Sequence, residues 1–149
     1  YDKISEKVFV KKFSSEFLYR QGGMGMFIRY NANPQGKNVG DCTVRAISKA
    51  LGKEWGEVYT GLCLEGYKAG DMPPANHVWG AYLRRYGFRR YVIPDDCPDC
   101  YTVSDFAADH PRGIFVLALS GHVVCVQDGN WYDTWDSGQV VPLYYWQKG

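Results

Sequence analysis

The chain has 149 residues, the length of one ordinary domain rather than two. Hydrophobic residues make up 46% and charged residues 22%, a globular mixture that excludes disorder, collagen and a coiled coil. Lys and Arg number 17 against 16 Asp and Glu, so the charge balance gives no reason to expect nucleic acid as a partner.

The longest purely apolar run, Ile114–Leu119, is far too short to span a bilayer, so no membrane partner is expected. The five cysteines are odd in number and scattered, unlike a disulfide framework, which favours a reducing compartment such as the cytoplasm. Cys97 and Cys100 have metal-ligand spacing, but no second such pair completes a zinc site. A proline-containing turn at 94–100 is therefore favoured over a zinc or redox module, and we expect no metal and no organic cofactor.

Two strand-like runs open the chain, at 7–13 and 24–30, around a Gln-Gly-Gly turn at 21–23. A long polar loop rich in Gly, Asn and Pro follows at 31–40. We interpret residues 1–32 as an N-terminal extension of a single domain that covers 1–149.

Residues 33–90 are predicted to form a helical half of the domain. Apolar residues at helical spacing predict one helix from Cys42 to Gly52 and a second over 54–68, and a third opens at Pro73-Pro74 and ends at Gly87. Four arginines between 84 and 90 alternate with aromatic residues. We expect a solvated helix end there, with arginine stems covering aromatic rings, rather than a nucleic-acid surface.

Residues 91–149 are predicted to form a sheet half. A short helix is expected at 103–108, and Asp128-Gly129 is a strong hairpin signal. Strand-like runs lie at 114–119, 122–127, 131–135 and 140–146, and Pro142 marks the last as an edge strand. Helices followed by an antiparallel sheet predict an α+β fold.

Cys42 is the first candidate for chemistry, because it lies in the first turn of a predicted helix. Unpaired backbone N–H groups and the helix dipole favour the thiolate there, and the same groups can donate to an oxyanion. A buried helical cysteine is commonly only a small hydrophobic residue. The polar loop before Cys42 instead leaves room for a substrate.

His122 begins a predicted strand, and the hairpin that follows returns two carboxylates toward it. With a two-residue turn, Asp133 is the diagonal neighbour of His122 on the same face; with a three-residue loop, His122 faces Asp136. Turn chemistry favours Asp133. Cys42, His122 and one of these aspartates would form a nucleophile, a base and a residue that orients the base.

Three segments resemble the papain-like cysteine peptidases, and most closely their small bacterial and phage forms similar to bacteriocin-processing (C39-like) peptidases. They are Asn38–Ala46, Gly121–Val124 and Tyr132–Ser137. The resemblance covers roughly 33–146 and implies a papain-like fold, with the helix of Cys42 packed on the sheet. It also implies that Cys42 attacks a carbonyl and His122 acts as base, and the family pattern favours Asp136 as the orienting residue.

The family's oxyanion glutamine has no counterpart here, because Gly36 stands at the expected position. Gln35 and Asn38 flank it, and either amide is a candidate donor beside the Cys42 backbone N–H. We predict a thiol hydrolase that cleaves a peptide or amide bond of a peptide or protein substrate through an acyl-enzyme. The alternatives are a weak or inactive papain-fold binding or regulatory protein, and a papain-fold acyltransferase or amidase.

Overall fold

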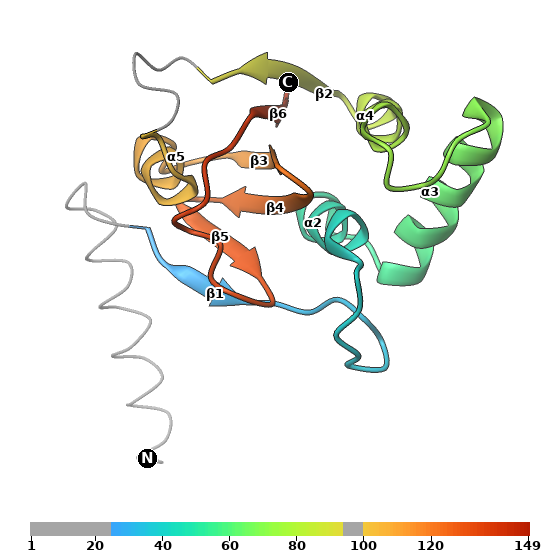
Figure 1. Ribbon diagram of the computed structural model, residues 1–149, viewed down its shortest axis with the longest axis horizontal. Helices are drawn as coiled ribbons and strands as arrows, with labels where there is room; N and C mark the ends of the chain where they lie inside the picture. Colours follow the sequence, from blue (N-terminus) through green and yellow to red (C-terminus); the bar gives the residue numbers. More distant parts are fainter. Residues whose placement is uncertain (1–24, 94–99) are drawn as a thin grey trace, which may run out of the picture.

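The computed structural model describes residues 25–93 and 100–149. The expected strand at 7–13, the turn at 21–23 and Cys97 lie outside the described residues. Figure 1 shows a central sheet with helices α2, α3 and α4 toward one side and α5 on the other. The described residues are therefore α+β, as predicted.

The helices lie close to the positions that the apolar spacing predicted. Gly52 and Gly70 adopt the left-handed conformation that ends α2 and α3. The third helix begins slightly after the two prolines that were expected to open it. The four helices in the described residues are α2 (Cys42–Leu51), α3 (Trp55–Ala69), α4 (Asn76–Arg85) and α5 (Val103–Asp109).

The sheet has six strands in the order β1-β5-β4-β3-β6-β2. It is mixed rather than purely antiparallel, because β1 runs parallel to β5 while the other pairs are antiparallel. This corrects the predicted antiparallel sheet. The strands are β1 (Phe27–Arg29), β2 (Phe88–Val92), β3 (Ile114–Leu119), β4 (His122–Gln127), β5 (Asn130–Asp133) and β6 (Tyr144–Lys148).

Strand β2 was not predicted, and the expected boundary between the two halves at 90 falls inside it. Gly87, at a φ of 84°, turns the chain out of α4, and Phe88 then enters the core at 2% exposure. The prediction of an edge strand at 140–146 was also wrong. Strand β6 lies between β3 and β2 and is therefore not an edge strand. Pro142 stands outside it, because proline cannot donate to the ladder, which begins only at Tyr144.

The β4–β5 hairpin has the two-residue turn that Asp128 and Gly129 predicted. Both residues have positive φ, 50° and 81°, and Gln127 pairs with Asn130. This turn sets the register of every residue downstream on β5.

The core has two parts, one on each face of the sheet. The first packs α2, α3 and α4 against the sheet, with Ile47, Val58 and Trp79 fully buried. The second packs α5 against the opposite face through Phe106 and Phe115. The first part fixes α2 against β4, and so determines where the start of α2 meets the sheet.

Candidate active site

Cys42 is the first residue of α2 and is half-buried. It follows Asp41, whose backbone carbonyl accepts the N–H of Arg45 and so belongs to the first helical turn. The N–H groups at such a helix start have no partner within the helix. The predicted location of the thiol, at a helix start after a polar loop, is confirmed.

His122 is the first residue of β4 and pairs with Leu119 across the tight turn at Gly121. Its side chain is 14% exposed. The ring lies against Trp135, with 4.8 Å between the ring centroids. His122 is thus held at the end of the strand but is still open to solvent on one side.

Asp133 ends β5 and is the carboxylate that contacts His122. Its Oδ2 atom lies 2.7 Å from His122 Nε2 and 2.8 Å from the Ser137 hydroxyl. Its Oδ1 atom accepts from Arg45 and from the Thr134 backbone N–H, both at 2.8 Å. An ionised carboxylate only accepts, so Nε2 carries the hydrogen and Nδ1 is left for the thiol.

Asp136 does not contact His122, contrary to what the family pattern favoured. Its Oδ1 atom accepts from Trp131 Nε1 at 2.8 Å and from the Gly138 backbone N–H at 3.0 Å. The two-residue turn is the physical reason, because it places Asp133 and not Asp136 on the diagonal from His122. The interpretation from turn chemistry was therefore the correct one.

Arg45 joins this carboxylate to the helix that carries the thiol. Its guanidinium lies 2.6 Å from Asp41 and 2.8 Å from Asp133, and all three side chains are at most 5% exposed. Asp41 also accepts from Trp55 Nε1 at 2.9 Å. Sequence reasoning gave Arg45, Trp55 and Ser137 no role, although the i, i+4 spacing of Asp41 and Arg45 was a usable signal.

The electrostatics of the pair favour a thiolate beside an imidazolium. Burial alone would raise the pKa of the Cys42 thiol, but hydrogen bonding and charge from His122, with the Val123 backbone N–H, lower it below its ordinary value. Burial alone would lower the pKa of His122, but Asp133 and Cys42 together raise it to about 9. Both shifts favour the ion pair over the neutral pair.

Gln35 and Asn38 lie on the loop between β1 and α2, and both are exposed. The loop is braced by its own asparagines: Asn33 accepts from the Gln35 backbone N–H, and Asn31 donates to the Lys37 carbonyl. Within the part of the chain described, no hydrogen bond joins either candidate amide to Cys42. Backbone N–H groups at the start of α2 are therefore the remaining candidates for oxyanion donors beside the thiol.

The remaining cysteines are not alike. Cys63 and Cys125 are free, as Cys42 is, whereas Cys100 is disulfide-bonded. The expectation of reduced cysteines thus fails for Cys100. Among residues 25–93 and 100–149, no cluster of His, Cys, Asp and Glu could hold a metal ion.

No helix in the described ranges is long and apolar enough to cross a membrane. Comparison of the chain with protein-family models, curated proteins and solved structures gave no match. The geometry of Cys42, His122 and Asp133 is therefore the basis on which the function is inferred.

Proposed function

We propose that this chain is a papain-like cysteine peptidase, a thiol hydrolase that cleaves a peptide or amide bond through an acyl-enzyme. The observation that carries the proposal is the 2.7 Å hydrogen bond that His122 Nε2 donates to Asp133 Oδ2, which leaves the second ring nitrogen for a thiol at a helix start. A nucleophile, a base and a buried residue that orients the base make up a complete set for acyl transfer.

In the first step, the Cys42 thiolate attacks the carbonyl carbon, a C–S bond forms, and the carbonyl oxygen takes the negative charge. Backbone N–H groups at the start of α2 stabilise this oxyanion. The His122 imidazolium then gives its Nδ1 proton to the leaving nitrogen as the C–N bond breaks. The amine departs and the acyl group remains on sulfur as a thioester.

In the second step, His122 is neutral and accepts a proton from water as the water oxygen attacks the thioester. The C–S bond breaks, the carboxylic acid leaves, and the thiolate–imidazolium pair returns. Asp133 holds the imidazole in one tautomer and orientation throughout, because both of its oxygens are fixed by other donors. No metal or organic cofactor is needed for either step.

The proposal is tested by the acyl-enzyme itself. Full-length protein is mixed with p-nitrophenyl acetate, an activated ester, and the release of p-nitrophenol is followed together with mass-spectrometric mapping of the acetyl group. We expect a burst of about one equivalent, with the acetyl group on Cys42. Cys42→Ala should abolish the burst, His122→Ala should slow it, and Cys63→Ala should leave it unchanged.

Peptide cleavage is measured in parallel, by incubating wild type and Cys42→Ala with a mixed peptide library and mapping new termini. Termini made only by wild type support a peptidase. An acetyl adduct without peptide cleavage would point to the acyltransferase or amidase alternative. A Cys42 no more reactive than Cys63 would contradict the enzyme and leave the binding-protein alternative.

A further inference from the structure

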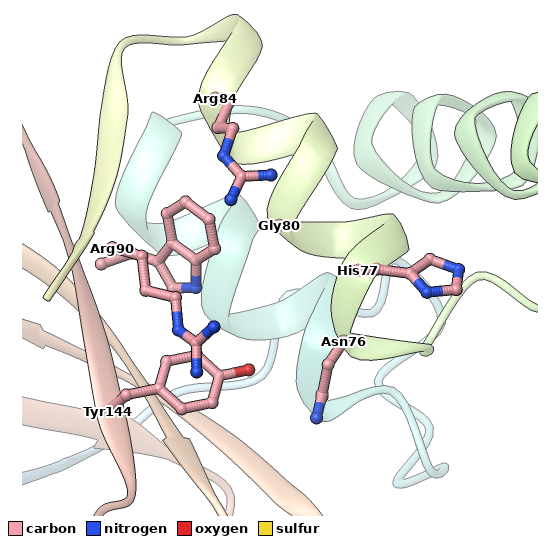
Figure 2. A pocket seen from close by; sticks show the side chains of 7 residues that line it. Asn76, His77, Gly80, Arg84, Arg90 and Tyr144 are labelled. Carbon is pink, nitrogen blue, oxygen red and sulfur yellow. The ribbon is translucent and has the colours of Figure 1, made fainter. Parts of the chain in front are cut away.

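A pocket whose lining includes none of Cys42, His122 and Asp133 lies between α4, β2 and β6. Its volume is about 410 Å³, and side chains from all three elements line it. Figure 2 shows Arg84 entering from α4 and Arg90 from β2. The lining includes Asn76, His77, Arg84, Arg90, Tyr144 and Trp146, and none of its residues is acidic.

Among the described residues, no carboxylate forms a salt bridge with either arginine of this pocket. Arg84 lies 5.0 Å from the Trp146 ring centroid, and Arg90 lies 4.0 Å from that of Tyr144. Within the described residues neither forms a salt bridge, whereas Arg85 pairs with Glu65 at 2.7 Å. Arginines over aromatic rings were expected here, although Arg90 is on a strand and not a helix end. Stacking leaves the N–H edges of both guanidiniums free to donate.

Trp146 supplies an unused donor at the same place. It is 2% exposed, lies directly across the ladder from Arg90, and its buried Nε1 atom has no hydrogen-bond partner. Buried polar groups in proteins almost always have one, and an indole N–H can only donate. Gly80 makes room for this ring, since a Cβ atom there would lie 2.8 Å from Trp146 Cζ2.

The mouth of the pocket adds further donors. Asn76 and His77 are the first residues of α4, so the positive end of the helix dipole lies at the pocket. The side-chain oxygen of Asn76, Oδ1, accepts from Trp79 Nε1 at 3.1 Å, which leaves the NH₂ group of the same amide available to donate. His77 pairs with Asp71 at 3.0 Å outside this lining.

We propose that this pocket binds the phosphate group of a small phosphomonoester. Two guanidiniums without a salt-bridge partner in the described part of the chain match the double negative charge of such a group, and its three terminal oxygens can accept from both arginines and the Trp146 indole. The volume exceeds that of a bare phosphate and leaves space for a small organic part. The proposal is independent of the thiol chemistry.

The test is a titration of the ¹⁵N-labelled full chain with inorganic phosphate, followed by NMR at the Trp146 indole N–H. Trp146→Phe identifies that signal among the five tryptophans by its loss. We expect a saturable downfield shift as the orphan N–H gains an acceptor. Arg84→Gln and Arg90→Gln should each weaken binding about tenfold or more, the usual effect of losing a charge-assisted hydrogen bond.

Arg89→Gln is the matched control, because it removes the same charge from the same strand but from the opposite face. It should change the dissociation constant less than twofold. The proposal is overturned if phosphate gives no saturable shift or if Arg89→Gln weakens binding as much as Arg90→Gln. Acetate binding as tightly as phosphate would overturn it too, as would binding of a single-stranded oligonucleotide without binding of phosphate.

Discussion

Arg45 on α2 donates to Asp133 on β5 across 2.8 Å, although the two residues are 88 positions apart in the chain. The same guanidinium holds Asp41, the residue before the candidate nucleophile, at 2.6 Å. One cation therefore ties the carboxylate that orients His122 to the helix turn that presents Cys42. The relative position of Cys42 and His122 depends on a buried ion pair as well as on sheet packing.

Asp133→Asn should raise the pKa of the Cys42 thiol, while Asp136→Asn should leave it unchanged. The first change removes the charge that holds His122 protonated, and the thiolate fraction then falls about tenfold for each unit of increase in the thiol pKa. It should also cost about 3 kcal/mol of unfolding free energy, because Arg45 loses a buried partner. The measurements are the pH profile of iodoacetamide alkylation and urea unfolding. Equal effects of the two substitutions would contradict the register.

Arg45→Met should destabilise the fold by about 3 kcal/mol, since two buried carboxylates lose their cation. It should at the same time raise the pKa of His122 further, because Asp133 then acts on His122 alone. Urea unfolding and the NMR titration of the His122 ring measure the two effects. Lys53→Gln is the control: its pair with Glu57 is on the surface, and its loss should leave the unfolding midpoint unchanged. If Arg45→Met unfolds at the same urea concentration as the wild type, the proposed stabilising role of the Arg45 guanidinium is refuted.

The His122–Asp133 pair should stabilise the protein at low pH and not at high pH. The pKa of His122 is raised from 6.5 to about 9 on folding, so its contribution is complete below pH 6.5 and is lost as pH rises through the folded value. The pKa of the Cys42 thiol is lowered on folding, so its contribution to stability has the opposite pH dependence. The test therefore removes Cys42 from both proteins and compares Cys42→Ala with Cys42→Ala/His122→Gln. Without Cys42, burial still lowers the pKa of His122 and Asp133 alone raises it, so the comparison isolates the contribution of Asp133. The difference in unfolding free energy should shrink between pH 6 and 9; a constant difference would rule out the raised pKa.

Gly80→Ala and Gly56→Ala should change stability in opposite directions. Both glycines are helical, but a Cβ atom at Gly80 meets the Trp146 ring at 2.8 Å, whereas one at Gly56 meets nothing within 4 Å. The first substitution should cost about 1–3 kcal/mol by overpacking. The second should stabilise by about 0.5 kcal/mol, because alanine loses less backbone freedom on folding. Thermal unfolding of both variants measures the difference, and a stabilised Gly80→Ala would show that the indole can move.

The sequence was most informative where local chemistry determines structure. The Asp128-Gly129 turn needs positive φ at both positions, and that requirement alone set the register that brings Asp133 to His122. Gly52 likewise ended α2, and the apolar spacing placed Cys42 at its start. Each of these inferences used residues within a few positions of one another.

Contacts between distant segments were beyond sequence reasoning. Strand β1 joins β5 in parallel and β2 joins β6, and neither pairing leaves a local signal in the chain. The bond from Arg45 to Asp133 depends on how α2 packs on the sheet. The i, i+4 spacing could have indicated only the pair of Arg45 with Asp41, and that pair was not predicted. The orphan indole of Trp146 is likewise a property of packing and not of composition.

The bridge made by Arg45 also makes the chemistry of Cys42 a reporter of folding. In an unfolded chain, Asp41 and Asp133 are independent carboxylates, and Cys42 is an ordinary thiol with no imidazolium beside it. Once β5 docks on α2, Arg45 pairs with both carboxylates and His122 forms its hydrogen bond to Asp133. The pKa of the Cys42 thiol then falls. The pKa of the Cys42 thiol is therefore lowered only when α2 and β5 have been assembled, and a nascent or damaged chain carries an ordinary thiol at this position.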